Sequence, residues 1–555
     1  MLSEKIVKEY DRWCEKAKAD RDLIQELKKM SQEQIEDSFY RDLAFGTGGL
    51  RGTIGAGTNR MNVYTVARAT RGLSFYIKVH YPNNPSVVIG YDSRINSQLF
   101  AETAAAIFYA NDIKAYLWDR LLPVPTVSFA TRYLHASAGV MITASHNPSK
   151  YNGYKVYGDD GCQITTTAAT NILSCINSFD YFESSIPTFE DAMVDYIPEK
   201  VLDAFIENVK AQSVIKEPID RNVAIVYTPL NGTGLEPVTR VLQETGFNNI
   251  TVVEEQRDPD GNFPTCPYPN PEIKEALAYG LEYCERLNAD LLLGTDPDCD
   301  RCGIAVRAAD GSYRLLSGNE TGLLLLDFIC SQRIKNGTMP KNPIMIKTIV
   351  TSDMGEQIAD HYGVKTINVL TGFKFIGEQI GYLEKDGHES DYIFGFEESY
   401  GYLTGGYVRD KDAVDASFMI AEMFAYYKTH GISLLEKLDE LYKTYGYRLN
   451  TLHSYEFDGA SGFAKMQEIM KKFHEGVDEF GGKKVEKILD YSKGLDGLPK
   501  SDVLKYLLEG NSSVIVRPSG TEPKLKVYIS ISDKSMEAAG VVEKKIDEQI
   551  AGYMK

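Results

Sequence analysis

The sequence predicts three consecutive α/β domains with mixed, mostly parallel sheets, followed by a C-terminal α+β domain, all around a central cleft. From about residue 86, short β-branched or leucine-rich runs alternate with segments of helical length. Such alternation is typical of βαβ units, and buried parallel strands consist of continuous apolar runs. The alternation occurs three times, with breaks near residues 200 and 315, and its character changes after about residue 446.

The first predicted domain spans residues 1–200. Its first 40 residues have helical spacing and dense charge, so we expect an N-terminal helical extension. The segment SVVIGYD at 86–92 predicts a strand, QLFAETAAAIFYAND at 98–112 a helix, and AGVMITAS at 138–145 another strand. The domain therefore begins with helices and continues as an alternating α/β unit.

The second predicted domain spans residues 201–315, the third 316–445 and the fourth 446–555. Strands of the second are expected at NVAIVYTPL, NITVVEE and ADLLLGTD, with helices at EPVTRVLQETGF and PEIKEALAYGLEYCERLN. Strands of the third are expected at PIMIKTIVTS, TINVLTG and YIFGFEES. In the fourth, helices at 461–475 and 535–550 flank the strands SSVIVRPSG and KLKVYISIS, which predicts a smaller α+β domain.

Composition excludes several classes of function. The 555-residue chain has a formal net charge of −18, so it lacks the cationic excess that a general nucleic-acid partner requires. Its apolar runs are too short to span a bilayer, and the charged N-terminus lacks the apolar region of a secretory signal. The eight cysteines are scattered. We therefore expect a cytoplasmic protein without membrane or nucleic-acid partners, and the sequence leaves its oligomeric state open.

A predicted strand at 139–143 stops abruptly at Ser145, His146, Asn147 and Pro148. A strand that merely ends does not need a hydroxyl beside an imidazole, so Ser145 is a candidate nucleophile; the alternative is a simple cap. A neutral serine is a weak nucleophile and needs a base, a cation or both.

The stretch LLLGTDPDCDRCGIAV at 291–306 ends a predicted strand with three alternating carboxylates, Asp296, Asp298 and Asp300. Their oxygens can converge on one hard cation such as Mg²⁺ or Ca²⁺, and three carboxylates at the end of a buried strand repel one another without one. The alternative is a solvated acidic turn. An EF-hand is excluded because its sixth position would be Arg301 rather than Gly.

Three further loops carry binding chemistry. VIVRPSGTEPK at 514–524 presents an Arg fork, two hydroxyls and a glycine, which suits phosphate, although a tight turn would have similar residues. FGFEESYGYL at 394–403 offers carboxylates and a hydroxyl to a polyol. The glycines of FGTGGLRGTIGAG at 45–57 could cradle a phosphate, but their spacing is not that of a P-loop. With one such site per domain, a shared cleft could hold a sugar phosphate for phosphoryl transfer.

These motifs resemble those of the α-D-phosphohexomutase family, and most closely its phosphoglucomutase/phosphopentomutase branch. The matching segments are TASHNP (143–148), DPDCDR (296–301), FEES (396–399) and RPSGTEPK (517–524), supported by GGLRG (48–52) and NGYK (152–155). They occur in the family's order over nearly the whole chain. The resemblance implies a phosphoglucomutase of the isomerase class, an intramolecular phosphotransferase that interconverts α-D-glucose 1-phosphate and glucose 6-phosphate.

The resemblance also implies roles for single residues. Ser145 would carry the phosphoryl group and, with Asp296, Asp298 and Asp300, hold Mg²⁺. Arg51, His146 and Lys155 would lie beside it, with Lys155 acting as a base if the pocket lowers its pKa. Glucose 1,6-bisphosphate would be intermediate and activator. Substrate contacts are expected at Arg301, Thr371, Gly372, Glu397, Ser399, Arg409 and Lys411, and phosphate contacts at Arg517, Ser519, Gly520 and Thr521.

Two departures from the family pattern bear on specificity. Tyr400, Gly401 and Tyr402 stand where several phosphomannomutase-type members carry a histidine, which favours glucose or pentose phosphates and leaves the proton-transfer group of the third domain open. Pro297 and Cys299 replace small residues in the carboxylate loop without removing a carboxylate, so we interpret Cys299 and Cys302 as structural. Phosphopentomutase, phosphomannomutase or glucosamine phosphate activity, a sugar-phosphate phosphatase and a non-catalytic sensor remain the alternatives.

Overall fold

The structure is a computed structural model, and it describes residues 2–46, 48–457, 459–495, 497–519 and 524–554. The N-terminal extension forms α1 (Glu4–Lys16), α2 (Arg21–Leu27) and α3 (Gln32–Phe39). Trp13 of α1 is fully buried and packs edge-on against Phe39 and Tyr64. The extension is therefore attached to the first α/β domain through an aromatic cluster.

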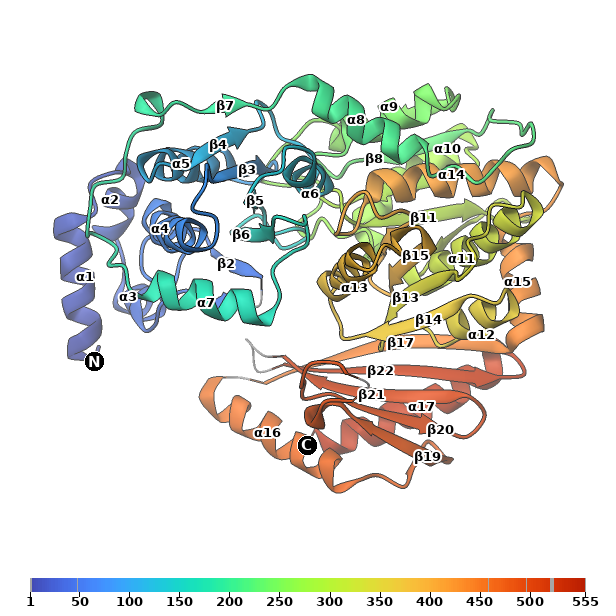
Figure 1. The fold of residues 1–555 in the computed structure, drawn as a ribbon. Helices are drawn as coiled ribbons and strands as arrows, with labels where there is room; N and C mark the ends of the chain where they lie inside the picture. Colours follow the sequence, from blue (N-terminus) through green and yellow to red (C-terminus); the bar gives the residue numbers. More distant parts are fainter. Residues whose placement is uncertain (1, 47, 458, 496, 520–523, 555) are drawn as a thin grey trace.

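The sheet of the first domain has the strand order β1-β2-β6-β5-β3-β4-β7. Its strands are β1 (Phe45–Gly46), β2 (Gly49–Thr53), β3 (Ser86–Tyr91), β4 (Lys114–Leu117), β5 (Ala138–Ile142), β6 (Tyr151–Gly158) and β7 (Asp195–Tyr196). The helices α4 (Val63–His80), α5 (Ser97–Ala110), α6 (Val124–Tyr133) and α7 (Thr166–Asn177) pack around it (Figure 1). The strands predicted at 86–92 and 138–145 are β3 and β5.

The second sheet has the order β12-β11-β10-β8-β9. It contains β8 (Ile225–Thr228), β9 (Ile250–Val252), β10 (Leu291–Thr295), β11 (Cys302–Arg307) and β12 (Tyr313–Leu316), with α8 (Glu199–Lys210), α9 (Leu235–Glu244) and α10 (Ala278–Leu287). The predicted helix over 271–288 is shorter than expected: a 3₁₀ turn over Lys274–Leu277 precedes α10.

The third sheet has the order β14-β13-β15-β16, and the fourth has the order β17-β22-β21-β20-β19-β18. The third domain contains β13 (Ile344–Thr348), β14 (Lys365–Val369), β15 (Tyr392–Glu397) and β16 (Gly401–Leu403), with α11 (Gly318–Lys335), α12 (Met354–His361), α13 (Phe373–Lys385), α14 (Ala413–Thr429) and α15 (Leu434–Tyr445). The fourth contains β17 (Tyr447–Glu456), β18 (Glu479–Phe480), β19 (Lys483–Asp490), β20 (Leu504–Leu508), β21 (Ser512–Pro518) and β22 (Lys524–Asp533), with α16 (Gly459–Glu475) and α17 (Met536–Tyr553).

The mixed α/β sheets of the first three domains are confirmed, and they share a detail that periodicity did not reveal. Each motif-bearing strand is followed by an antiparallel return strand: β5 pairs with β6, β10 with β11, and β15 with β16. The motif loops connect these pairs. Each of the three loops contains a non-glycine residue with positive φ: Ser145 (53°), Cys299 (53°) and Tyr400 (66°). Such left-handed residues carry backbone strain, which concentrates at functional sites.

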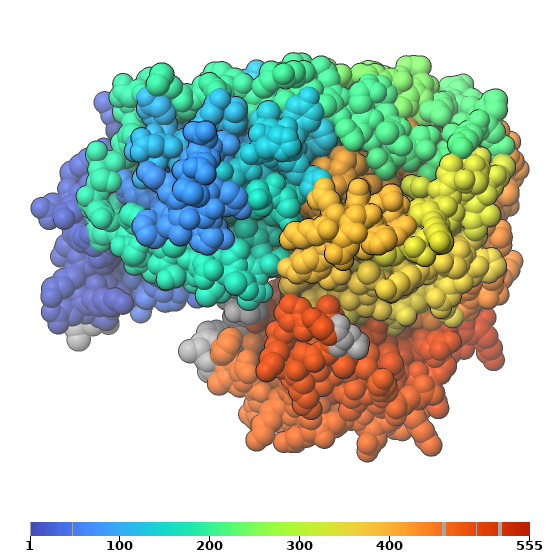
Figure 2. Space-filling model, viewed as in Figure 1, coloured from blue at the N-terminus to red at the C-terminus, as the bar shows by residue number. Residues whose placement is uncertain are grey.

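One buried apolar cluster reaches into each of the first three domains, from Phe129 through Tyr227 and Leu325 to Phe418. A separate cluster, which includes Trp13 and Leu73, fills the rest of the first domain. The fourth domain has its own core around Phe473, and a smaller apolar cluster, which includes Ile349 and Ile515, joins it to the third domain. In Figure 2 the fourth domain, in orange and red, projects below the others and leaves a hollow beneath the first domain.

Within the described ranges, no helix combines the length and the apolar character that a membrane span requires.

Candidate active site

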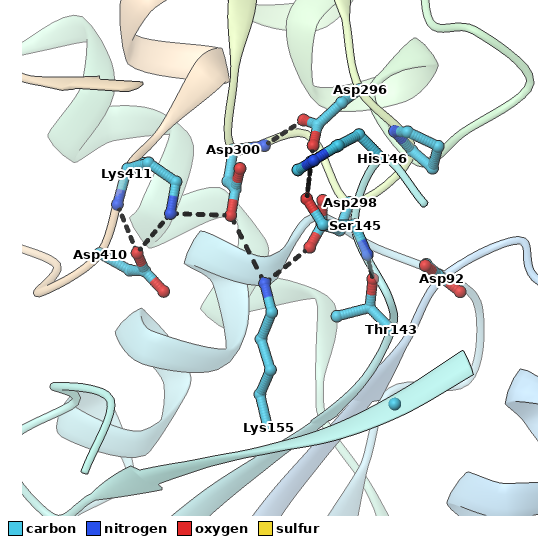
Figure 3. Close-up of polar contacts among 12 residues, drawn as sticks. Asp92, Thr143, Ser145, His146, Lys155, Asp296, Asp298, Asp300, Asp410 and Lys411 are labelled. Atoms are coloured by element: carbon cyan, nitrogen blue, oxygen red, sulfur yellow. Dashed lines mark hydrogen bonds and ion pairs between the residues drawn. The ribbon is translucent and has the colours of Figure 1, made fainter. Parts of the chain in front are cut away.

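Ser145 lies in the β5–β6 loop and is 4% exposed. Its hydroxyl donates to Asp296 Oδ2 at 2.8 Å and lies 3.3 Å from His146 Nδ1, while its amide donates to Thr143 Oγ1 at 2.8 Å (Figure 3). The loop therefore presents the hydroxyl of the first domain directly to a carboxylate of the second.

Arg94, after β3, holds this loop in place. Its guanidinium donates to the backbone carbonyls of Ser145, Asn147, Pro148 and Tyr151. The side chain is buried, and its Nε lies 3.5 Å from Asp92 Oδ2. These bonds occupy the carbonyl groups that a left-handed turn leaves outside any ladder. Arg94 was not predicted; the polar run Asp-Ser-Arg at the end of a buried strand was the available signal.

Asp296, Asp298 and Asp300 follow β10, and one oxygen from each lies within 4.8 Å of the others. All three are buried. Among the described residues, Asp298 Oδ1 and Asp300 Oδ1 are buried without a hydrogen-bond partner. Burial, together with Asp298 and Asp300, raises the pKa of Asp296 well above its usual range. Converging, underpartnered carboxylates of this kind suit a divalent cation, so the donor set fits a metal ion.

Two lysines compensate part of this negative charge. Lys155 Nζ, on β6, lies 2.8 Å from Asp298 Oδ2, and Lys411 Nζ lies 3.1 Å from Asp300 Oδ2 (Figure 3). Burial disfavours the charge on Lys155, but Asp298 and Asp300 outweigh burial and raise its pKa. The lowered pKa that would make Lys155 a base is therefore not found, and Lys155 acts as a cation.

His146 shows the opposite behaviour. Burial, with Arg301 and Arg51 nearby, lowers its pKa well below the usual value. The imidazole is neutral at pH 7 and can exchange a hydrogen bond with the Ser145 hydroxyl without adding charge.

Glu397 ends β15 and is 5% exposed. Its Oε1 accepts the amide of Gly372 at 3.0 Å, and burial raises its pKa. The next residue, Glu398, accepts the Thr351 hydroxyl at 3.2 Å, and burial together with Glu397 raises its pKa to about 7. This arrangement places carboxylates and a backbone turn where hydroxyl groups of a ligand could bind.

A cavity of about 640 Å³ collects most of the predicted site residues. Its lining includes Arg51, Ser145, His146, Lys155, Asp300, Arg301, Thr371, Gly372, Glu397, Ser399, Lys411 and Arg517. Asp296 and Asp298 lie behind this lining, bonded to Ser145 and Lys155. The four domains thus contribute to one cavity, within the size range of small-molecule sites.

The phosphate loop is only partly described. Ser519 is described, and its amide donates to the carbonyl of Lys524 at 2.7 Å. Gly520 and Thr521 lie outside the described residues. Arg517 faces Lys526 across β21 and β22. Burial, followed by repulsion from Arg517, lowers the pKa of Lys526. Two cations paired across strands repel each other unless an anion lies between them.

Arg409 lies elsewhere. Its guanidinium donates to Glu384 Oε2 at 2.9 Å and to Gly406 O, and its amide donates to the Ser128 hydroxyl at 2.9 Å. It is not among the described residues that line the cavity. We attribute to Arg409 a role in joining the first and third domains, and we do not include it in the proposed substrate site.

The carboxylate loop is fixed by backbone hydrogen bonds to both neighbouring domains. Asp298 O accepts the amide of Val124 at 2.9 Å, and Cys299 O accepts the amide of Ala413 at 3.2 Å. Cys302 N donates to Tyr400 O at 3.0 Å. Cys299 and Cys302 are free and buried, and burial raises the pKa of both thiols. This agrees with the interpretation of these two cysteines as structural.

Comparison with known families decides the relationship. Models described as "Phosphoglucomutase/phosphomannomutase" match residues 42–182 (alpha/beta/alpha domain I), 203–311 (domain II), 317–445 (domain III) and 460–547 (C-terminal domain). The chain belongs to the phosphoglucomutase/phosphomannomutase family. The predicted membership of the α-D-phosphohexomutases is thereby confirmed, and the protein is a mutase, an enzyme of the isomerase class.

Individual relatives agree with this membership. A protein named phosphoglucomutase from Staphylococcus epidermidis is 37% identical over 537 residues, covering 94% of this mutase and 96% of the relative. A Paramecium phosphoglucomutase structure (parafusin, open form) superposes with a TM-score of 0.65 at 17% identity, covering 93% and 94% of the two chains. A family protein from Burkholderia thailandensis superposes with a TM-score of 0.67 at 17% identity, covering 92% and 97%. The two structures show the shared fold.

The mutase cavity also contains residues that sequence reasoning missed. Lys374, Lys526, Glu272 and Asn270 line it. Lys374 stands two residues after Gly372, and burial lowers its pKa to about 8. Glu272 forms an ion pair with Arg301, which directly follows the three aspartates. Lys526 could have been found from strand pairing, since it is the register partner of Arg517.

Proposed function

We propose that this mutase is a phosphoglucomutase that interconverts α-D-glucose 1-phosphate and glucose 6-phosphate through phosphorylated Ser145 and a glucose 1,6-bisphosphate intermediate. The observation that carries the proposal is the hydrogen bond from the Ser145 hydroxyl to Asp296 at the edge of a cavity that Glu397 and Arg517 also line. Relatives named phosphoglucomutase at 37% identity favour glucose over mannose or pentose phosphates.

Asp296, Asp298 and Asp300, with an oxygen of the Ser145 phosphate, would hold Mg²⁺, the cation that all-oxygen donor sets of this kind prefer. When bound, Mg²⁺ would neutralise charge on the phosphoryl oxygens during transfer. Lys155 and Lys411 already compensate two of the carboxylates, which leaves Asp296 in need of a cation.

In the first half-reaction, the bond between Ser145 Oγ and phosphorus breaks and a new bond forms between phosphorus and the 6-hydroxyl oxygen of glucose 1-phosphate. Arg51 and Lys155 would stabilise the charge of the transferring group. The sugar hydroxyl gives up its proton to a base. Lys374 suits this role because its pKa of about 8 lies near working pH. As Ser145 Oγ leaves phosphorus, the neutral His146, whose Nδ1 lies 3.3 Å away, would relay a proton from solvent to it, so that Ser145 ends the step as a hydroxyl.

In the second half-reaction the bisphosphate turns over in the cavity, the bond between phosphorus and the oxygen at carbon 1 breaks, and a new bond forms between phosphorus and Ser145 Oγ. The Ser145 hydroxyl would return its proton through His146, and the oxygen at carbon 1 takes the proton held by Lys374. Added glucose 1,6-bisphosphate would act as an activator because it phosphorylates any free Ser145. A closed fourth domain would exclude water, which competes with the sugar hydroxyl for the phosphoryl group.

The non-reacting phosphate would bind to Arg517, Ser519 and Lys526, together with Gly520 and Thr521 of the same motif. Glu397 and Ser399 would accept and donate hydrogen bonds to sugar hydroxyls, with Thr371, Gly372, Arg301 and Lys411 completing the sugar site. The paired anchoring at both ends of the substrate favours a mutase over a phosphatase, since only a mutase must hold both phosphates in turn.

The test is formation of glucose 6-phosphate from glucose 1-phosphate with Mg²⁺ and a trace of glucose 1,6-bisphosphate, for wild type and Ser145→Ala. Mannose 1-phosphate and ribose 1-phosphate run in parallel, and inorganic phosphate release is monitored. We expect Mg²⁺-dependent turnover, highest on glucose 1-phosphate, that is lost in Ser145→Ala. Comparable activity in Ser145→Ala would exclude Ser145 as the carrier, and stoichiometric phosphate release would indicate a phosphatase.

A further inference from the structure

A second cavity, of about 610 Å³, lies between the third and fourth domains. Its lining combines the edge strand β14, the helix α12, the edge strand β17 and the strands β19 and β20 with the residues that follow them. Figure 1 shows β14 above β17 where the two domains meet. The cavity is nearly as large as the active-site cavity, and nothing in the proposed reaction uses it.

Buried polar atoms without partners border this cavity. Arg448, on β17, is 2% exposed, and its Nε and Nη1 have no hydrogen-bond partner among the described residues. Its Nη2 donates only to the neutral amide of Gln357, at 3.4 Å. Thr366 Oγ1 and Asn368 Oδ1 are also buried and unpartnered. Thr366 and Asn368 are two residues apart on β14 and therefore share a face.

The charges around Arg448 do not balance. Lys347 lies 3.1 Å from Asp353 and 3.0 Å from Glu356, and Lys505 lies 2.7 Å from Asp353. Three buried cations, Arg448 among them, therefore face two carboxylates. Asp360 and Glu486 also line the cavity, but they are exposed, so solvent screens them.

An unpaired buried guanidinium is costly, and its Nε and Nη edge is a bidentate fork for an oxyanion. We propose that this second cavity is a binding site for a small organic phosphate that carries hydroxyl groups. Its phosphate would pair with Arg448 and Lys505, and its hydroxyls would bond to Thr366 and Asn368. The proposal does not depend on the mutase reaction.

The second cavity shares part of its lining with the active-site cavity. Asp353, Lys505 and Ile349 line both cavities. Lys505 belongs to β20 of the fourth domain, and its Nζ also donates to Ile349 O at 3.2 Å. An anion that attracts Lys505 would therefore weaken the ion pair between Lys505 and Asp353, which connects the fourth domain to residues that line the active-site cavity.

Isothermal titration calorimetry with inorganic phosphate and with glycerol 3-phosphate tests the proposal. The Arg517→Gln variant weakens phosphate binding in the active site, and the part of its remaining phosphate binding that Arg448→Met removes reports on the second cavity. In the Arg517→Gln background, we expect Arg448→Met to weaken both ligands at least roughly tenfold, because a charged pair is lost. Arg71→Met is the matched control, since Arg71 is also buried with an unpartnered Nη1 but lines neither cavity; it should leave both affinities unchanged.

Thermal unfolding provides the second readout. Without anion, Arg448→Met should unfold at the same temperature as wild type or higher, because an unpaired buried charge is removed. Phosphate should raise the Tm of Arg517→Gln but not that of the Arg448→Met, Arg517→Gln double variant. If Arg448→Met does not fold, Thr366→Val carries the test: it should weaken glycerol 3-phosphate but not inorganic phosphate.

Three results would overturn the proposal or part of it. Loss of all phosphate binding in Arg517→Gln would show that the active site is the only site. Equal affinity of Arg448→Met and its parent would show that the guanidinium does not bind the anion. Equal affinity for inorganic phosphate and glycerol 3-phosphate would refute the hydroxyl contacts at Thr366 and Asn368.

Discussion

Replacing Arg94 with lysine should impair catalysis without weakening substrate binding. Lysine keeps the charge beside Asp92, but an ammonium group has fewer donors and no planar fork, so it cannot reach all the loop carbonyls that Arg94 holds. Ser145 sits at φ 53°, and a non-glycine residue in this region costs about 1–2 kcal/mol. Without the hydrogen bonds from Arg94, the β5–β6 loop relaxes toward other conformers.

A conformational penalty of that size corresponds to a roughly 5- to 30-fold loss of the competent loop population, and we expect kcat to fall by this factor. The KM for glucose 1-phosphate should stay the same, because Arg94 is not among the described residues that line the cavity.

The matched control is Arg71→Lys, since Arg71 is also buried and donates to the carbonyls of Ser184 and Ser185, away from the cavity. Both variants should lose stability, and steady-state kinetics well below their Tm separates stability from catalysis. The reasoning fails if Arg94→Lys and Arg71→Lys lose equal stability and their kcat values agree within about twofold.

Three further outcomes are expected. Asp298→Asn removes a carboxylate and the partner of Lys155, so activity should fall by about 10³-fold or more. Mg²⁺ should raise the Tm of wild type in calorimetry but not that of Asp298→Asn. Lys374 is a base only when neutral, so kcat/KM should rise about tenfold between pH 7 and 9 with an inflection near its pKa of about 8, and Lys374→Arg should flatten that rise. Lys526→Met should raise the KM for glucose 1-phosphate about tenfold with little change in kcat; a change confined to kcat would contradict phosphate binding.

Much of the fold could be predicted because buried strands and helices have regular patterns. The apolar runs at 86–92 and 138–145 are β3 and β5, and the charged N-terminal segment is helical. The return strand β6 escaped prediction because its sequence, YNGYKVYG, contains glycines and a lysine. The glycine-rich stretch at 45–57 was considered as a phosphate cradle, but Gly49–Thr53 within it is strand β2, paired with β6. Pairing across space, rather than local propensity, decides such strands.

The candidate site was predictable where chemistry is concentrated in short motifs. Ser145 and the three aspartates do converge, although they are separated by about 150 positions in sequence. The protonation state of Lys155 was not predictable, since it depends on Asp298 and Asp300 of another domain. Arg409 illustrates a different case: this cation beside a motif donates to Glu384 and is not among the described residues that line the cavity, so its predicted substrate contact stays a prediction. The domain limits at 200, 315 and 445 stay predictions.

The shared core has a consequence for how this enzyme could change over evolutionary time. One apolar cluster reaches into each of the first three domains, and the carboxylate loop is hydrogen-bonded to the first and the third domain. Exchange of one of these domains alone would therefore expose apolar surface of the other two. The fourth domain has a separate core and is joined to the third domain through a small apolar cluster. A chimera that replaces only residues after 446 should fold and keep its cation site, so new substrate preferences could be acquired by recombination at that one boundary.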